Sequence, residues 1–397
     1  MSAYKSVCSL LPPMLCLALV AGNARADDDE DVDPFTISLY SQAVRDDNLF
    51  RLADNYAALG VTLPAGASRE DDVFSTGLAI DGRKQYSRQL WQVSADIASR
   101  RFANNDSFNY VGGNGALRWN WSTAADLSGT LAASYNRFLS GFANNTSYTR
   151  DLIQSYNYTG SLLWGLGARW SLTAEGGYKQ SRHDAATRAY QDVDAVTGTV
   201  GLQYETRRGH LLGWNYTHGH GQYPDPLSNY NDDAAKLSWT LLLSEVLSFE
   251  GQAGYQKREY PGDAGRNFSG DVWNADLNWK PGGRSSVLLS GWRAVRAWED
   301  ADADHYVATG VQLRPVWDTG LHWSAELVGS WEHQRYLSDT GVSARIDNLG
   351  VAGITLRYTF LKRLQLSGGA RLEQRQSTEA LYRYDDHVYT LGVRASW

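Results

Sequence analysis

The sequence predicts an all-β protein: a transmembrane, antiparallel, up-and-down β-barrel of about 18 strands, of the outer-membrane type. Three observations lead to this prediction. First, apolar and polar residues alternate in eighteen segments between residues 35 and 397, which is the pattern of strands with one apolar face. Second, the connections between these segments alternate between long and short, as in barrels of the outer membrane. Third, the chain begins with a stretch typical of a secretory signal.

The N-terminal segment, residues 1–26, is predicted to be a signal peptide. Lys5 precedes an apolar run over 10–21, and the small residues Ala24 and Ala26 precede a cleavage site after Ala26. Both cysteines, Cys8 and Cys16, lie within this segment. The mature chain therefore has no thiol for a disulfide, a nucleophile or a metal site.

Residues 27–34 form an acidic leader that reads DDDEDVDP. The run lacks the glycine and the ligand spacing of an EF-hand loop, so we interpret it as a solvated tail. Calcium binding and docking to a periplasmic partner are the alternatives. The strand pattern begins directly afterwards, so the barrel is expected to occupy residues 35–397.

Composition excludes other classes of protein. No further stretch contains the roughly 18 to 20 apolar residues that a membrane helix needs, and the mean hydropathy is −0.43. A barrel is compatible with this value, because only every second residue of each strand faces lipid. The formal charge of −7 argues against nucleic acid as a partner, and no cofactor is expected.

The connections predict the topology. If the long ones are extracellular, both ends of the barrel are periplasmic. The long connections include 43–72, 138–151, 181–192, 221–233, 333–347 and 375–385, and the short ones include 165–167, 206–209, 245, 281–285 and 361–362.

Tryptophan residues support the same assignment of faces. Trp119 and Trp121 share a strand face with Leu117, and Trp239 shares one with Leu237. No tryptophan is expected on a polar face. Aromatic rings near both ends of the strands would form the two girdles that contact outer-membrane lipid.

The opposite strand faces are predicted to line an aqueous channel. They carry both signs of charge together with many amides and hydroxyls, a wall that suits water, ions and sugars. Barrels of 16 to 18 strands are wide enough for such a channel. Most of the opposed charges are expected to pair across neighbouring strands. The candidate lumen residues are Arg118, Lys179, Glu205, Lys236, Asp276, Arg293, Arg314, Glu326, Arg357, Arg371, Glu373 and Arg394.

The last strand ends on an aromatic residue with apolar residues at every second position before it. It resembles the closing strand of bacterial outer-membrane barrels, which their assembly machinery recognises. That resemblance implies this machinery as a partner and the bacterial outer membrane as the location. The residues that carry it are Tyr389, Leu391, Val393, Ala395 and Trp397.

The first long connection contains the motif DDNLFR, a few residues after DPF at 33–35. Together they resemble EpsL, an outer-membrane component linked to exopolysaccharide operons, and the wider group of β-barrel porins. The match covers only about residues 33–54. A turn is the simpler physical interpretation of the motif, and a calcium or sugar contact is the alternative. The motif residues are Asp46, Asp47, Asn48, Leu49, Phe50 and Arg51.

The resemblance implies a pore that exports an exopolysaccharide, with polysaccharide and a periplasmic polysaccharide-export component as partners. A general or sugar-selective diffusion porin is the alternative. A barrel enzyme is a weaker second alternative, because the chain has no GxSxG turn and its histidines are scattered. His218 and His220 share a strand face, where a metal pair is geometrically possible, but a solvated rim is the better interpretation. We therefore expect no catalytic residues and no metal site.

Overall fold

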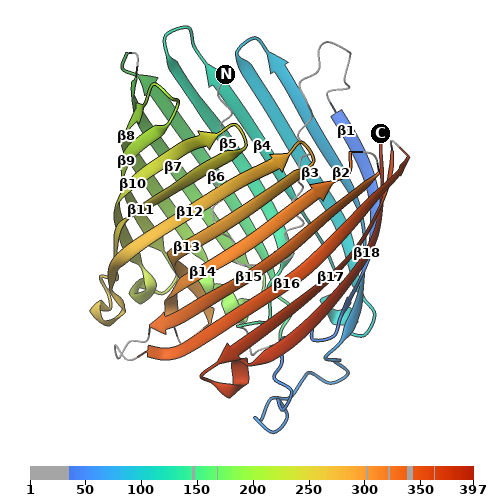
Figure 1. Ribbon diagram of the computed structural model, residues 1–397. Helices are drawn as coiled ribbons and strands as arrows, with labels where there is room; N and C mark the ends of the chain where they lie inside the picture. The colour runs from blue at the N-terminus through green and yellow to red at the C-terminus, as the bar shows by residue number, and fades with distance from the viewer. Residues whose placement is uncertain are drawn as a thin grey trace. The chain divides into compact units, whose positions relative to one another are not determined.

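A computed structural model describes residues 35–144, 148–167, 169–300, 303–320, 322–337, 343–361 and 363–397. They form one antiparallel barrel of 18 strands (Figure 1). Each strand pairs with its neighbours in the sequence, and the pairing of β1 with β18 closes the ring. The predicted fold class is therefore confirmed. The predicted signal peptide and acidic leader lie outside the described residues.

The strands are 12 to 19 residues long. They are β1 Phe35–Asp46, β2 Asp71–Tyr86, β3 Gln89–Phe102, β4 Tyr110–Ser122, β5 Leu127–Leu139, β6 Leu152–Gly165, β7 Trp170–His183, β8 Val193–Glu205, β9 Leu211–Gln222, β10 Tyr230–Ser244, β11 Leu247–Glu259, β12 Phe268–Gly282, β13 Ser285–Asp300, β14 Ala303–Asp318, β15 Trp323–Leu337, β16 Ser343–Leu361, β17 Leu364–Ser377 and β18 Tyr384–Ser396.

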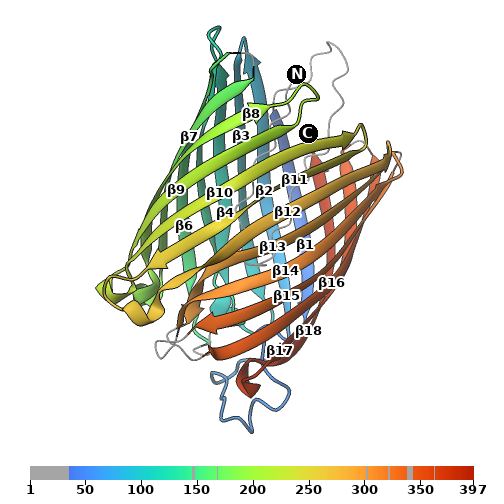
Figure 2. The same cartoon turned by 60° about the vertical axis from the view of Figure 1, so that its left-hand side comes forward.

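The apolar side chains lie on the outside of the ring. Leu39 pairs with Leu78, which pairs with Ile97 on the next strand, and both Leu39 and Ile97 are more than half exposed. This is the reverse of a water-soluble fold and fits a surface surrounded by hydrocarbon. The strands are inclined to the barrel axis, as closure requires (Figure 2). Among the described residues, no helix is long and apolar enough to cross a membrane.

Short turns close one end of the barrel, and five 3₁₀ turns lie in the longer connections at the other end (Figure 1). The short turn after β8 uses Gly209, whose φ of 76° favours glycine. The 3₁₀ turns are η1 Asp106–Phe108, η2 Ala186–Gln191, η3 Pro226–Ser228, η4 Ala264–Arg266 and η5 Ala380–Tyr382.

The strict alternation of long and short connections is wrong at two places: between β13 and β14, and between β15 and β16, where residues 338–342 are no more numerous than those of the turn 206–210. β13 and β14 remain paired up to Asp300 and Ala303, so their connection at the long-loop end is short. The apolar pattern ends where a strand leaves the lipid, but the backbone pairing of the two strands continues beyond it. For the same reason β15 and β16 extend beyond their predicted ends.

Candidate pore and its inner wall

The strand register places eleven of the twelve predicted lumen residues on the inner face. Each lies on the face opposite to the exposed apolar residues of its own strand: Arg357, for example, pairs with Ser324, whereas its neighbour Leu356 is exposed. The eleven are Arg118, Lys179, Glu205, Lys236, Asp276, Arg314, Glu326, Arg357, Arg371, Glu373 and Arg394.

Arg293 is the exception, and its predicted place in the lumen is wrong. It pairs with the outward-facing Trp273, and its guanidinium contacts the carboxylate of Asp271 at 3.2 Å. The neighbouring Trp292 points inward instead, and its indole N–H donates to Glu332 at 2.9 Å. Trp292 also contradicts the expectation that no tryptophan lies on a polar face, since Glu332 and Arg296 give it a polar environment.

Many inner charges pair with one another. Glu326 contacts both Arg314, at 3.4 Å, and Arg357, at 3.2 Å. Tyr40 donates to Asp96 at 2.7 Å, and the guanidinium of Arg394 lies 5.4 Å from the Tyr40 ring. These contacts involve strands β1, β3, β14, β15, β16 and β18, so this side of the wall carries the arginine-rich pairs.

The opposite side of the wall carries carboxylates without counter-ions. Glu250 on β11 lies directly across from Asp276 on β12. In the described part of the chain, neither of them has a side-chain hydrogen bond or an ion pair, and the same holds for Glu175 on β7. Like charges that face each other across strands destabilise a sheet, so this arrangement has a cost that folding alone does not explain.

The DDNLFR motif forms a turn that folds against the inside of the wall. Asp46 accepts the backbone N–H of Asn48 at 2.9 Å. The buried Asn48 side chain exchanges two hydrogen bonds with the backbone of Leu52, at 2.8 and 2.9 Å. It also donates to the carbonyl of Asp385 on β18 at 2.8 Å. The turn interpretation therefore describes the geometry of the motif.

Arg51 connects the motif to three strands. Its guanidinium contacts Asp46 at 3.1 Å, Asp386 at 2.9 Å and Glu373 at 3.9 Å. Asp46, Asp47 and Asp386 lie close enough together to hold a metal ion. However, Arg51 already supplies a positive charge to two of them, so the geometry does not call for a cation.

Phe50 of the motif belongs to an aromatic cluster at the same end of the barrel. Its ring lies 5.6 Å from Phe108, 4.9 Å from Phe142 and 5.5 Å from Tyr148, all edge-on. These residues come from three different connections, and Phe102 at the end of β3 joins them. The cluster ties the loops β1–β2, β3–β4 and β5–β6 into one body.

The β5–β6 connection crosses the mouth of the barrel. We call its described residues, 140–144 and 148–151, the strap. At its far side, Arg375 on β17 donates to the carbonyl of Ala143 at 2.6 Å and to Asn144 at 2.7 Å. Arg345 on β16 also donates to Asn144, at 3.3 Å. Because β17 lies six strands from β5 around the ring, the strap narrows the opening.

Both arginines at the far side contact an aromatic ring and Asp347; for Arg375 the ring is that of Tyr384, at 5.2 Å, and Asp347 lies at 3.7 Å. The guanidinium of Arg345 lies between the rings of Tyr336 and Tyr382, at 4.1 and 3.6 Å. Asp347, which is fully buried, contacts Arg345 at 3.0 Å. Stacking and pairing together restrict the rotamers of these long side chains.

The strap is also fixed at its base. Asp151 is fully buried and lies 2.7 Å from the ring of His183. Arg188 donates to Ser140 at 3.0 Å. Burial by itself would raise the pKa of Asp151, but the hydrogen bond and the charge of His183, with help from the N–H of Ala185, lower it overall. The strap is therefore held at both sides of the mouth.

His218 and His220 each have a polar partner on β10. Both point outward at the rim, where His218 contacts Asp233 at 2.9 Å and His220 contacts Asn231 at 2.8 Å.

At the other end of the barrel, the C-terminal residue closes the ring: the backbone of Trp397 exchanges hydrogen bonds with Ile37 at 2.8 and 2.9 Å.

Comparisons with known proteins agree with this architecture. A family model described as "Putative beta-barrel porin 2" matches residues 231–397. No curated protein matches the chain by sequence. The match does not include residues 33–54, so the resemblance to the exopolysaccharide component gains no support from it.

Several solved structures are similar at low sequence identity. A BenF-like porin from Pseudomonas fluorescens is 10% identical, with a TM-score of 0.48 over 92% of this chain and 100% of that one. OccAB3 from Acinetobacter baumannii is 9% identical, with a TM-score of 0.46 over 92% and 100%. OpdK from Pseudomonas aeruginosa is 12% identical, with a TM-score of 0.45 over 91% and 99%. The closed barrel and its apolar outer face identify a transmembrane β-barrel of the bacterial outer membrane, and residues 231–397 are similar to a family of β-barrel porins.

Proposed function

We propose that this porin is a passive diffusion channel for small polar solutes, and that the strap limits their size. The observation that carries the proposal is the strap itself, which is bound to Arg375 and Arg345 on one side and to His183 and Arg188 on the other. A polar lumen with a fixed constriction selects by size and by weak contacts.

The distribution of charge suggests which solutes pass. The unpartnered carboxylates of Glu250 and Asp276 lie on β11 and β12, which are nine strands from β2 and β3 in the 18-strand ring. The side that contains β2 and β3 carries the inward Arg118 and Arg394. A solute with both charges, such as an amino acid, would be oriented between these walls.

Polysaccharide export is the second candidate, and it rests on the resemblance of residues 33–54. The geometry gives it less support. Asn48 is buried and Arg51 is engaged with three carboxylates, so the motif serves the barrel wall and offers few groups to a sugar. The strap also obstructs the mouth through which a polymer chain would leave.

Planar-bilayer recording of the purified protein tests the proposal. We expect the wild type to conduct, and Arg375→Ala to raise the single-channel conductance because it releases the strap.

Glu250→Gln with Asp276→Asn should shift the reversal potential in a salt gradient toward anion selectivity. Arg293→Gln is the matched control, since this charge faces outward and should leave selectivity unchanged.

Two results would contradict the proposal. One is a barrel that does not conduct, whether as the wild type or as the Arg375→Ala variant. The other is a deletion strain that loses surface polysaccharide but keeps normal uptake of small solutes, which would replace diffusion by export. We expect no catalytic activity, whether the barrel serves diffusion or export.

A further inference from the structure

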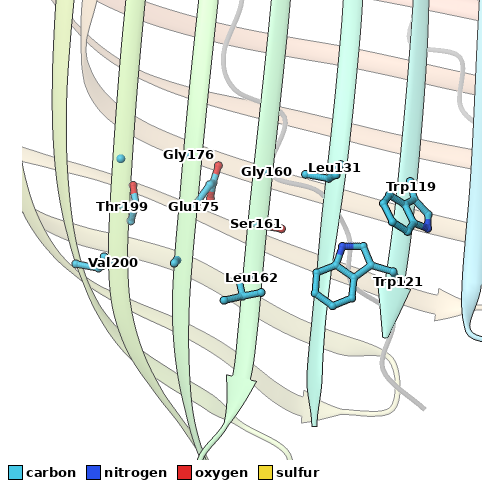
Figure 3. A pocket seen from close by; sticks show the side chains of 12 residues that line it. Trp119, Trp121, Leu131, Gly160, Ser161, Leu162, Glu175, Gly176, Thr199 and Val200 are labelled. Carbon is cyan, nitrogen blue, oxygen red and sulfur yellow. The ribbon is translucent and has the colours of Figure 1, made fainter. Parts of the chain in front are cut away.

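The outer surface over β4–β8 carries a groove in the lipid-facing band (Figure 3). Its floor is the backbone of Gly160, Gly176 and Gly198, which lie directly across from one another on β6, β7 and β8. Two adjoining hollows of about 620 and 550 Å³ share Gly160 and Gly176. The side chains that form the walls are Trp119, Trp121, Leu131, Leu162, Val200, Tyr158 and Tyr178.

Packing within the barrel does not explain Gly176 and Gly198, whereas a Cβ at Gly160 would lie 3.1 Å from Leu131. A Cβ atom added to Gly176 or Gly198 would meet nothing within 4 Å. Glycine weakens a strand interior, and a position without steric need for it often marks the close approach of another molecule. Val196 and Val200, which flank Gly198 on the same face, are more than half exposed, so the floor is a hollow among projecting apolar side chains.

Between the groove and the long-loop end, the outer face carries first aromatic side chains and then positively charged ones. The rings of Tyr135 and Tyr156 lie 4.9 Å apart, at the position of an interfacial girdle. Beyond them, Arg137, Gln154 and Arg182 lie side by side on β5, β6 and β7.

Arg137 is the cation of this rim that lacks a counter-ion. Arg182 is neutralised by Asp194. Arg137 makes no side-chain hydrogen bond or ion pair with any described residue, and its Nε is buried without a partner. An unpaired guanidinium at the level of lipid headgroups is complementary to a phosphate.

The distance between the rim, formed by Arg137, Gln154 and Arg182, and the glycine floor of the groove matches the length of an acyl chain. Gln154 and Gly160 are six residues apart on β6, or about 20 Å along a strand. With the strand tilt of about 35 to 45°, the floor lies roughly 15 Å below the rim, which is about half the thickness of a bilayer core. A hydrocarbon chain attached to a headgroup at the rim would reach the groove.

We propose that the rim and groove bind one molecule of the phosphorylated glycolipid of the outer leaflet. Its phosphate contacts Arg137 and Gln154, and one acyl chain lies over Gly160, Gly176 and Gly198. Outer-membrane barrels direct their longer loops outward, so the long-loop side is expected to face the leaflet in which this lipid resides. A second copy of the barrel is the competing occupant, because bare backbone also permits close approach of protein.

Native mass spectrometry of the full barrel in detergent tests the proposal, with added phosphorylated glycolipid as the probe and phosphatidylglycerol as the comparison. We expect a single glycolipid adduct that survives mild activation. Gly176→Leu should remove it by filling the groove. Arg137→Gln should weaken it about tenfold, as expected for the loss of a charge-assisted bond.

Gly329→Leu is the matched control. Gly329 also faces outward, on β15, and a Cβ there would likewise meet nothing within 4 Å, so this variant should keep the adduct. Equal loss in Gly329→Leu, or equal binding of phosphatidylglycerol, would overturn the proposal. So would a dimer in the wild type that Gly176→Leu converts to a monomer, since the occupant would then be a second copy.

Discussion

Arg51 shows how one residue can join a loop to the wall of a barrel. Its guanidinium lies among Asp46, Asp386 and Glu373, which come from three adjoining strands. The sequence motif indicated a turn, and the turn is present. Its ion pairs with Asp386 and Glu373 could not be predicted, because these residues are more than 300 positions away in the sequence.

Replacing Arg51 should destabilise the barrel strongly. Arg51→Ala removes the guanidinium that contacts the buried Asp46 and Asp386, and breaking a buried pair in this way costs about 3 to 5 kcal/mol. Arg69→Ala is the control: its partner Asp54 is mostly exposed, so the loss should stay below about 1 kcal/mol. Urea unfolding in lipid vesicles measures both, and similar losses would contradict the role assigned to Arg51.

The two faces of a strand should respond oppositely to a charge. Leu237 faces lipid at the middle of β10 and is largely exposed, so Leu237→Arg should cost about 2 to 4 kcal/mol. Leu241→Arg, four residues closer to the short turn, should cost less. Ser238→Arg projects into the lumen and should be tolerated. Refolding titrations decide this, and equal effects of Leu237→Arg and Ser238→Arg would refute the assignment of faces.

The alternation of apolar and polar residues predicted the inner face of most strands. The assignment of faces was wrong at Trp292, whose partner on the lumen face is a carboxylate. The charge of Arg293 predicts a place in the lumen for this residue, and no tryptophan is expected on a polar face. In the structure Trp292 turns inward to Glu332, and Arg293 turns outward to Asp271. The polar partner of Trp292 lies two strands along the ring, on β15. The pattern of β13 agrees with this orientation, because Ser290 shares the face of Trp292 and Leu289 shares the face of Arg293.

At the scale of elements, the strands follow from the sequence and the loops do not. Eighteen predicted segments correspond to eighteen strands, because each must satisfy the same lipid boundary and the same backbone pairing. The strap has no such periodicity. Its contact with Arg375 joins residues 231 apart in the sequence, and only the closed ring brings them together.

The anchors of the loops should weaken in acid. The pKa of Asp151 is lowered, and that of Asp47 is lowered too: burial would raise it, but hydrogen bonds from the N–H and the ring of His387 outweigh this. A group whose folded pKa is depressed stabilises the fold above its unfolded pKa, near 4, and loses that contribution as the pH falls through the folded value.

We therefore expect channel noise and protease sensitivity of the β5–β6 loop to rise as the pH falls below about 4. Asp151→Asn should show the loosened behaviour already at neutral pH and respond less to acid. Limited proteolysis and bilayer recording at several pH values provide the measurement. A loop that stays equally protected from pH 7 down to pH 3 would argue against this anchoring.

For the whole molecule, closure places both ends of the barrel on the side of the short turns. β1 begins and β18 ends there, and Ile37 pairs with Trp397. The 3₁₀ turns and the strap gather at the opposite end. Outer-membrane barrels direct their longer loops outward, so the strap is expected at the cell surface and the ends of the barrel in the periplasm.

Epitope tags test this orientation in living cells. A tag inserted at 226–228, in the connection of β9 and β10, should be reached by antibody on intact cells, because this connection belongs to the long-loop end. A tag at 207–208, in the short turn of β8 and β9, should react only after the outer membrane is permeabilised. Both sites lie outside the strands and flank the same strand β9, so the two insertions disturb the fold comparably. If the accessibilities were reversed, the strap would face the periplasm, and it would then restrict solutes at the inner mouth of the pore.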